Sequence, residues 1–337
     1  MKFKLYLSDW AYNIGIIGFI RILEHNEVDR KLYTMRENYL EIDSSIFEEF
    51  ADYYFDYFIS IFDFTDRVSQ TFNTAIKQFE DDEDLKLRDY IKSLEDRFSK
   101  YQKAAARTEY EDEYKKLLKD LKSFKSAKRD KVDEDEFIGC LREIDNFIHN
   151  DEIRKKRAIN ILRAEFGNFF GQVSFLNPAF KGVYAKDFVQ KMKVDFIDVI
   201  ELEEDEKTKK KGRRKVYNCS FCSRETDHGY DFEESNFYLV GVSNKNQRNF
   251  FWDQNFKMPI CPLCRLIFMC LPAGAIKRTQ RSGESVYNFV NLDTDINSLY
   301  KINSNFRNRL SSADNPFKEI MLDLIGEMSQ KSTWTLQ

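Results

Sequence analysis

Four of the six cysteines stand in two C-x-x-C pairs, the pattern in this sequence with the clearest chemistry. The pairs are Cys219-Ser-Phe-Cys222 and Cys261-Pro-Leu-Cys264, with 38 residues between them. Each C-x-x-C turn can present two thiolates to one side, so the two pairs together match the four ligands of a tetrahedral Zn²⁺. Because protein ligands would fill all four positions, no place is left for an activated water, and we predict a structural zinc.

The alternatives for these cysteines explain less of the pattern. A redox C-x-x-C needs one pair only, and unrelated buried thiols have no reason to occur in two matched pairs. Cys270 and His228 are possible substitute ligands. Cys270 lies in the apolar run LIFMCL, where we expect a core position.

A basic run leads directly into the first cysteine pair. It consists of Lys207, Lys209, Lys210, Lys211, Arg213, Arg214 and Lys215. Such side chains neutralise phosphates without sequence preference, although a charge run is also common in solvated loops. The whole chain has 53 basic and 57 acidic residues, but residues 1–206 hold 33 against 44 and residues 207–337 hold 20 against 13. We therefore expect any polyanion contact mainly in the second part.

A second candidate for DNA contact is the segment GQVSFLNP at 171–178. Gln172, Ser174 and Asn177 are residue types that reach base edges or phosphates, and the flanking Gly and Pro would expose the backbone. An ordinary turn with Asn before Pro explains the same spacing. We take these three residues as weak candidates for reading a DNA motif.

No catalytic constellation is found in the sequence. The three histidines, His25, His149 and His228, stand in no recognisable nucleophile arrangement, and phosphate-binding, dinucleotide-binding and H-E-x-x-H motifs are missing. Acidic residues occur in runs typical of helix starts and solvated surfaces. We therefore predict that the protein is not an enzyme.

The composition indicates a mainly α fold with small β elements, that is, an α+β chain in which a helical body is joined to a zinc-ribbon-like unit. Hydrophobic residues make up 42% and aromatic residues 15%, whereas only 12 Gly and 5 Pro occur in 337 residues. We expect a strand-hairpin opening and a helical body in 1–206, a basic linker and a zinc-ribbon-like unit with short strands in 207–292, and the start of a C-terminal helical region in 293–337.

The opening of the chain is predicted in more detail. Alternation predicts a strand over 2–7, followed by Ser8 as N-cap of a helix that runs to about Glu24, and then a hairpin of 31–35 with 39–42. The apolar stretch of that helix is interrupted by Asn13 and Arg21 and is too short for a membrane span, and no cleavage site follows it. Paired free cysteines suit a reducing compartment, so we expect a cytoplasmic protein.

Spacings of three and four residues predict the helices that follow. They are expected over 46–78, from about 81 to 106, and over 109–128, 133–149, 152–170 and 184–200. The segment at 166–181 is expected to form a loop or an edge strand. From 216 to 292 we predict short strands at VYNC, NFYLVGV, LIFMCL and VYNFVNL, and helices return from Thr294.

Three parts of the sequence together resemble one known family. They are the opening SDWAYNIGIIGF at 8–19, the loop at 171–178, and the double C-x-x-C followed by RLIFMCLPAGA at 265–275. They look like the large subunit of the type I-B CRISPR effector complex, the Cas-eight class in its Cst-type branch, with this chain as an N-terminal portion. Members continue into a C-terminal bundle resembling the small subunit, so we expect that bundle to be truncated or vestigial here.

The resemblance implies a non-catalytic subunit of an RNA-guided surveillance complex (Cascade) in antiviral defence. It would sit at the crRNA 5′ end beside the backbone, 5′-end and small subunits, recognise the protospacer-adjacent motif in double-stranded DNA, aid R-loop formation and recruit the helicase-nuclease. The alternative is a standalone zinc-containing nuclease. A third interpretation is a helical protein-protein scaffold with a structural zinc.

Overall fold

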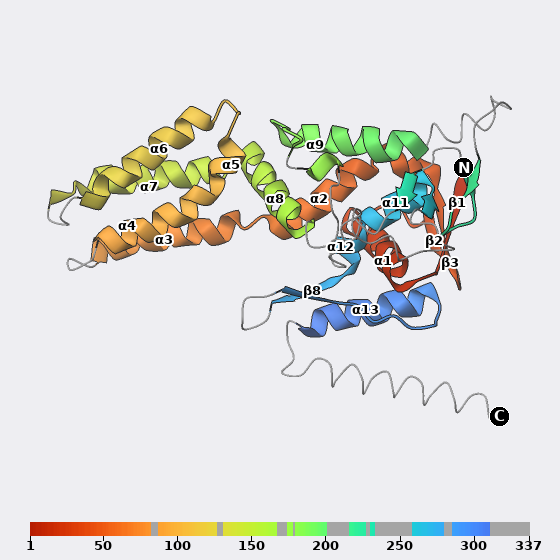
Figure 1. Ribbon diagram of the computed structural model, residues 1–337. Coiled ribbons are helices and arrows are strands. Elements are labelled where there is room, and N and C mark those ends of the chain that lie inside the picture. Colours follow the sequence, from red (N-terminus) through yellow and green to blue (C-terminus); the bar gives the residue numbers. More distant parts are fainter. Residues whose placement is uncertain are drawn as a thin grey trace, which may run out of the picture. The chain divides into compact units, whose positions relative to one another are not determined.

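The computed structural model describes residues 1–81, 87–126, 131–166, 174–177, 179–200, 216–226, 230–232, 258–279 and 285–310. The expected fold class is confirmed, because helices dominate and the strands form only small sheets (Figure 1). The chain divides into two compact units. Met1–Glu48, Lys211–Asp231 and Pro259–Gln337 form the first, here called the cysteine unit, and Glu49–Lys210 with Phe232–Met258 form the second, here called the helical unit.

This division differs from the expected body of residues 1–206. The opening 48 residues join the cysteine unit although more than 160 residues of sequence separate them from it. The physical reason is that the first helix is apolar on nearly all sides and is buried against the segment that follows the second cysteine pair. The expected boundary between residues 206 and 207 lies outside the described residues and stays a prediction.

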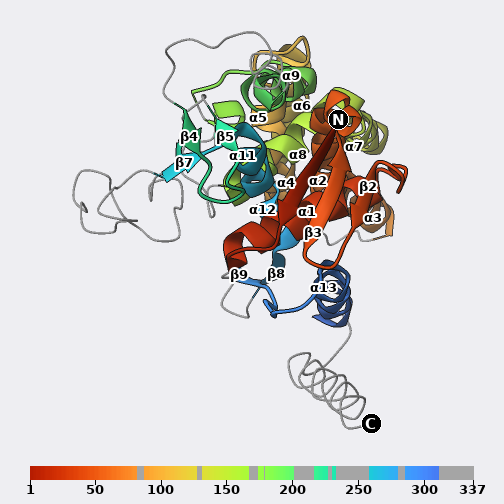
Figure 2. The same ribbon diagram turned by 90° about the vertical axis from the view of Figure 1, so that its right-hand side faces the viewer.

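The cysteine unit begins with the predicted strand, helix and hairpin. They are β1 (Lys2–Tyr6), α1 (Trp10–His25), β2 (Tyr33–Met35) and β3 (Tyr39–Asp43), followed by the 3₁₀ turn η1 (Ser44–Glu48). The strands form one antiparallel sheet in the order β1-β3-β2, with β3 in the centre (Figure 2). Burial alternates along β1 and β3, so one face of the sheet contributes to the core and the other faces solvent.

The N-cap of α1 is Asp9 and not Ser8, so that prediction is wrong by one residue. The Asp9 carboxylate accepts hydrogen bonds from the backbone N–H of Ala11 at 2.9 Å and of Tyr12 at 3.2 Å. A carboxylate there also interacts favourably with the helix dipole, which a serine hydroxyl does less well. The Ser8 N–H instead donates to Asn13 Oδ1 at 2.8 Å.

The later part of the cysteine unit alternates short strands with helices, and two of these strands, β6 and β7, each include one residue counted with the helical unit, Phe232 and Met258. Its elements are β4 (Tyr217–Asn218), β5 (Glu225–Thr226), β6 (Tyr230–Phe232), β7 (Met258–Ile260), α11 (Pro262–Met269), α12 (Leu271–Gly274), β8 (Ile276–Thr279), β9 (Ser285–Asn288) and α13 (Ile296–Leu310). Strand pairs are β4-β5, β6-β7 and β8-β9. The strands predicted at VYNC and VYNFVNL are present as β4 and β9, and NFYLVGV lies outside the described residues.

The strand predicted at LIFMCL is wrong, because residues 266–269 form the end of helix α11 and Leu271 begins α12. Cys261 has the extended backbone of an N-cap, and Pro262 occupies the first turn, where its missing N–H and fixed φ favour a helix. The run is buried on all sides, so its side chains show neither the period of a strand nor that of an amphipathic helix. The cysteine-proline start was the available signal for a helix.

Helix α1 packs against α11 and α12 at the level of the backbone. A Cβ placed on Gly18 would lie 1.9 Å from the Cys270 carbonyl oxygen, and one on Gly274 would lie 1.9 Å from the Ile14 carbonyl oxygen. Buried Arg21 donates to the carbonyls of Ala273 at 2.9 Å and Gly274 at 2.8 Å. Because the last carbonyls of a helix have no partner within it, this guanidinium satisfies the end of α12.

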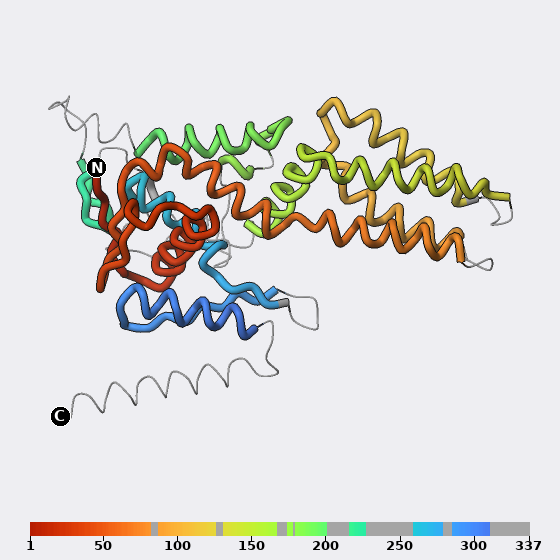
Figure 3. The backbone as a smooth tube through the Cα atoms, turned by 180° about the vertical axis from the view of Figure 1, so that it is seen from behind, coloured from red at the N-terminus to blue at the C-terminus, as the bar shows by residue number. Residues whose placement is uncertain are grey.

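The helical unit consists of helices joined by short turns. They are α2 (Phe50–Phe62), α3 (Thr65–Asp81), α4 (Leu87–Phe98), η2 (Ser99–Tyr101), α5 (Gln102–Ala105), α6 (Glu111–Ser123), η3 (Phe124–Ser126), α7 (Glu134–Ile148), α8 (Asp151–Phe166), η5 (Ser174–Leu176), α9 (Ala185–Met192) and the π-helical turn η6 (Lys193–Ile197). Within this unit α3, α4, α6 and α7 lie side by side around an apolar core (Figure 3).

The single helix predicted over 46–78 is divided in the structure. Helix α2 ends before Asp63, whose carboxylate accepts a hydrogen bond from the Thr65 N–H at 3.0 Å, at the start of α3. An Asp that accepts from the backbone two residues later favours a turn over a continuous helix. Among the described residues of 166–181, the expected loop or edge strand is represented by η5 and the turn that follows it.

Candidate metal centre

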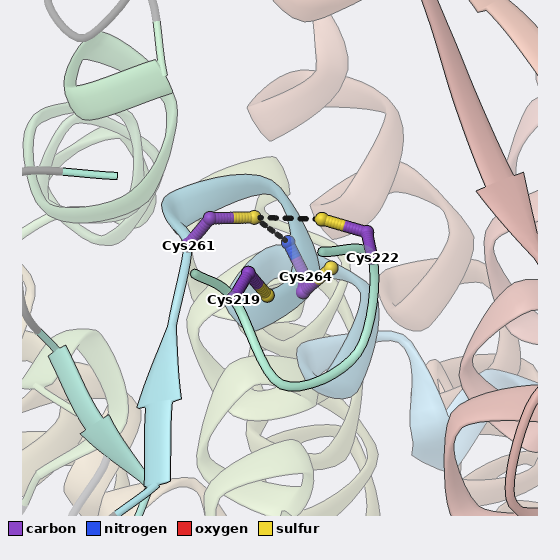
Figure 4. Close-up of side chains that lie close together, drawn as sticks. All are labelled: Cys219, Cys222, Cys261 and Cys264. Atoms are coloured by element: carbon purple, nitrogen blue, oxygen red, sulfur yellow. Dashed lines mark hydrogen bonds between the residues drawn. The ribbon is translucent and has the colours of Figure 1, made fainter. Parts of the chain in front are cut away.

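The structure brings the four cysteines of the two C-x-x-C pairs together (Figure 4). The Sγ atoms of Cys219, Cys222, Cys261 and Cys264 all lie within 4.8 Å of one another. Cys222 is partly exposed and the other three are buried. Within the described part of the chain, no other group of three or more His, Cys, Asp or Glu side chains is placed to hold a metal ion.

The first pair lies on a tight turn that follows β4. The Cys219 N–H donates to the Arg224 carbonyl at 2.8 Å, and the Ser223 N–H donates to the Cys219 carbonyl at 2.9 Å. Ser223 has a φ of 57°, the left-handed conformation that turns the chain sharply. The turn therefore returns the chain so that both thiols point to the same side.

The second pair lies at the start of α11. The Cys261 Sγ accepts a hydrogen bond from the Cys264 N–H at 3.4 Å, as an N-cap side chain does. The Ser220 N–H of the first turn donates to the Pro259 carbonyl at 3.0 Å, which joins the two turns. These hydrogen bonds therefore position both cysteine pairs without a bound metal ion.

The donor set and its spacing fit a metal ion with four thiolate ligands. At a Zn–S distance of about 2.3 Å, the sulfur atoms of a regular tetrahedral site lie about 3.8 Å apart. The Cys222 and Cys261 Sγ atoms are 3.6 Å apart, and the remaining separations stay below 4.8 Å. The four cysteines can therefore hold a metal ion in a closed, structural site.

Burial and the neighbouring thiols shift the pKa values of the cluster cysteines. Hydrogen bonds from Cys222, and then from Cys261 and Cys264, hold the pKa of Cys219 below that of an ordinary thiol. Burial, followed by the hydrogen bond with Cys219, raises the pKa of Cys264. A thiolate at Cys219 is thus stabilised by its neighbours, and a divalent cation would supply the positive charge that the more buried thiols need to ionise.

Three aromatic side chains contact one another beside the cluster, an arrangement that no local sequence pattern indicates. The Tyr12 hydroxyl lies 3.0 Å from the Cys264 Sγ. The Tyr12 ring stacks on Phe221 at 5.4 Å between centroids, and Phe221 meets Phe268 edge to face at 4.9 Å. Tyr12 comes from α1, Phe221 from the first turn and Phe268 from α11, so the cluster lies where the three segments meet.

Cys270 and His228 are the two possible substitute ligands named from the sequence. Cys270 is fully buried, and its S–H donates to the Leu266 carbonyl at 3.5 Å, so the prediction of a core position is confirmed. Burial also raises the pKa of its thiol. His228 lies outside the described residues.

The DNA-contact candidates lie in the loop at 171–178 and in the basic run at 207–215. Ser174 donates through Oγ to Asp195, and Asn177 Oδ1 accepts from the Ala179 N–H at 2.8 Å, both within the helical unit. Arg163 holds the same loop by donating to the carbonyls of Leu176 and Asn177. Gln172 and the basic run Lys207, Lys209, Lys210, Lys211, Arg213, Arg214 and Lys215 lie outside the described residues. A DNA contact of these residues stays a prediction.

Comparison with known protein families bears on the cysteine segment. Residues 212–276 match the model of a family described as CRISPR-associated protein (Cas_CXXC_CXXC). The matched stretch contains all four cluster cysteines and indicates a CRISPR-associated protein. No match was found among curated proteins or among solved structures. Of the helices in the described residues, none combines the length and the apolar character needed to span a membrane.

Proposed function

We propose that this chain is the N-terminal portion of a large subunit of a type I-B CRISPR effector complex, of the Cas-eight class in its Cst-type branch. The observation that carries the proposal is the four-cysteine cluster, which lies inside the CRISPR-associated match and packs on α1, the helix formed by most of the motif SDWAYNIGIIGF. The metal in the proposal is zinc, because four thiolates in a closed tetrahedral set are its common structural ligands.

The proposed role is recognition and not catalysis. The subunit would bind the crRNA 5′ end and the other Cascade subunits in the cytoplasm, recognise the protospacer-adjacent motif in duplex DNA, aid R-loop formation and recruit the helicase-nuclease. Gln172, Ser174 and Asn177 are the weak candidates for motif contact, and the basic run at 207–215 is the candidate for phosphate contact. A closed metal site supports this role because it leaves no coordination position for water.

The proposal is tested by co-expressing the chain with the other complex subunits and a guide RNA, and measuring binding to duplexes with a randomised motif. We expect weak binding by the chain alone and tight, motif-dependent binding by the assembled complex. Motif-independent binding by the complex would contradict the proposal. Specific DNA cleavage by the pure chain with divalent metal would instead support the standalone nuclease.

A further inference from the structure

The solvent-facing side of the sheet β1-β3-β2 carries a pair of aromatic rings with no part in the core. Along β1 the side chains of Lys2, Lys4 and Tyr6 are exposed, whereas Phe3 and Leu5 are buried. In the antiparallel register Tyr6 lies opposite Tyr39 of β3, and Lys4 lies opposite Glu41. Side chains opposite each other on one face are neighbours, so these four form one continuous surface.

The two rings lie close enough to form a single platform. Their centroids are 5.3 Å apart with an angle of 44° between the planes, and Tyr6 is 41% exposed. The Lys4 ammonium lies 4.9 Å from the centre of the Tyr39 ring. An exposed aromatic pair with a cation beside it combines a stacking surface for bases with a charge for phosphate.

The charges on this face leave one lysine available to an anion. Lys2 Nζ is 2.7 Å from Glu41 Oε1, so these two charges offset each other. Lys4 makes no ion pair with any residue that the structure describes, and its contact is with the Tyr39 ring. A phosphate beside the platform would therefore bind next to the Lys4 ammonium. The negative charge of Glu41 would repel it less, because Lys2 offsets that charge.

The two rings lie on adjacent, paired strands of the sheet. The chain order is strand, helix, strand, strand, and the spatial order β1-β3-β2 puts β3 between two strands that run parallel to each other. RNA recognition motifs stack two or three bases on aromatic side chains of such an open sheet face. Tyr6 on β1 and Tyr39 on β3 likewise present two neighbouring rings on an open sheet face.

We propose that this sheet face binds single-stranded RNA, with two adjacent bases stacked on Tyr6 and Tyr39 and a backbone phosphate beside Lys4. The inference goes beyond the proposed function, which assigns no residue to RNA contact. The surface lies within residues 2–43 and includes neither the cysteine cluster nor the candidates for motif contact. It holds for the chain alone and does not depend on assembly of a complex.

The test measures binding of the full chain to a short, unstructured, fluorescently labelled oligouridine by anisotropy, with the matching oligodeoxythymidine as a second arm. Replacing both rings, Tyr6→Ala with Tyr39→Ala, should weaken RNA binding by about 30-fold or more, since stacking contributes to the binding of each of the two bases. Tyr6→Phe with Tyr39→Phe keeps the rings and should bind nearly as the parent does. Lys4→Gln should weaken binding and reduce its salt dependence.

The matched control is Phe64→Ala in the helical unit, because Phe64 has the same exposed fraction as Tyr6, 41%. It should leave RNA binding unchanged.

Thermal unfolding followed by circular dichroism verifies that the double alanine variant is folded. If that variant is unfolded, the RNA affinities of the double phenylalanine variant and of Lys4→Gln, compared with the parent, still test the proposal. Unchanged RNA binding without the rings, or loss in the phenylalanine variant, would overturn the proposal, and equal affinity for DNA would overturn the assignment to RNA. Motif-dependent duplex binding by the complex is a separate measurement and decides only the proposed function.

Discussion

The Tyr12 hydroxyl lies 3.0 Å from the Cys264 Sγ, although the two residues are 252 positions apart in sequence. The phenol is completely buried, and burial together with the nearby Cys264 raises the pKa of Tyr12 well above its usual value. The hydroxyl therefore stays protonated and can donate its hydrogen bond to a Cys264 thiolate. Helix α1 thus contributes to the environment of the cysteine cluster, and occupation of the cluster is linked to the docking of α1.

Tyr12→Phe should weaken metal binding while leaving the packing of the cluster intact. The substitution removes the hydrogen bond to Cys264 and keeps the ring that stacks on Phe221. Outer-shell hydrogen bonds of this kind affect metal affinity by about 10- to 100-fold. Competition with a chromophoric chelator measures the affinity, and Tyr33→Phe, another buried tyrosine of the cysteine unit, is the control. Equal effects of the two substitutions would contradict a specific role of Tyr12.

Cys219→Ser or Cys261→Ser should each lose one equivalent of zinc, measured by elemental analysis. Closed zinc sites contribute directly to local folding, so hydrogen exchange should accelerate beyond Val216. Because Tyr12 and the glycines of α1 pack on this region, exchange should also accelerate in α1. Cys140→Ala, which changes a buried thiol of the helical unit, should keep its zinc. Full zinc in both cluster variants would refute the assignment.

The sequence could predict those features that local spacing determines. The two C-x-x-C pairs, the opening strand and helix, and most helices of the helical unit follow from spacing of residues near in sequence. The helix at LIFMCL was missed because a fully buried run has no distinguishing period. The contact of Tyr12 with Cys264 depends on tertiary packing, and no local pattern in a single sequence reports a neighbour 252 residues away.

Gly18→Ala should destabilise the cysteine unit strongly. The added methyl group would lie 1.9 Å from the Cys270 carbonyl oxygen, so α1 and α12 would have to separate. Overpacking of this kind typically lowers the free energy of unfolding by about 1–3 kcal/mol. Gly139→Ala in α7 is the matched control, because nothing lies within 4 Å of its added Cβ. There alanine should stabilise the helix by about 0.5–1 kcal/mol. Urea unfolding of both variants compares the two effects, and similar losses of stability would contradict the close approach.

Neutralising the basic run with glutamine at Lys207, Lys209, Lys210, Lys211, Arg213, Arg214 and Lys215 should lower the salt dependence of DNA binding by the assembled complex. Side chains that contact phosphates release counterions, so their loss reduces the slope of affinity against salt concentration. Motif preference should stay unchanged, because phosphate contacts carry no sequence information. Binding to duplexes at several salt concentrations tests this. A changed motif preference with an unchanged slope would contradict it, and a slope and preference both unchanged would favour the scaffold interpretation.

The ion pair of Asp63 and Arg154 should make the stability of the helical unit depend on pH. Arg154 donates to one Asp63 oxygen through Nε at 2.9 Å and through a terminal nitrogen at 2.7 Å. Burial raises the pKa of Asp63, but the hydrogen bonds from Thr65 and Arg154 outweigh it, so the pKa lies below its usual value. The contribution to stability is therefore complete above the unfolded-state pKa of about 4 and is lost as the pH falls through the lower folded-state value.

Asp63→Asn tests this pair. The substitution should destabilise the protein near neutral pH, and the difference from the parent in the free energy of unfolding should shrink below about pH 4. Any release of metal from the cysteines in acid affects both proteins equally and cancels in the difference. Asp112→Asn is the control, because Asp112 is 99% exposed and 3.9 Å from Lys115, and exposed pairs contribute little. A difference between parent and Asp63→Asn that stays constant with pH would show that the Asp63 charge does not stabilise the fold.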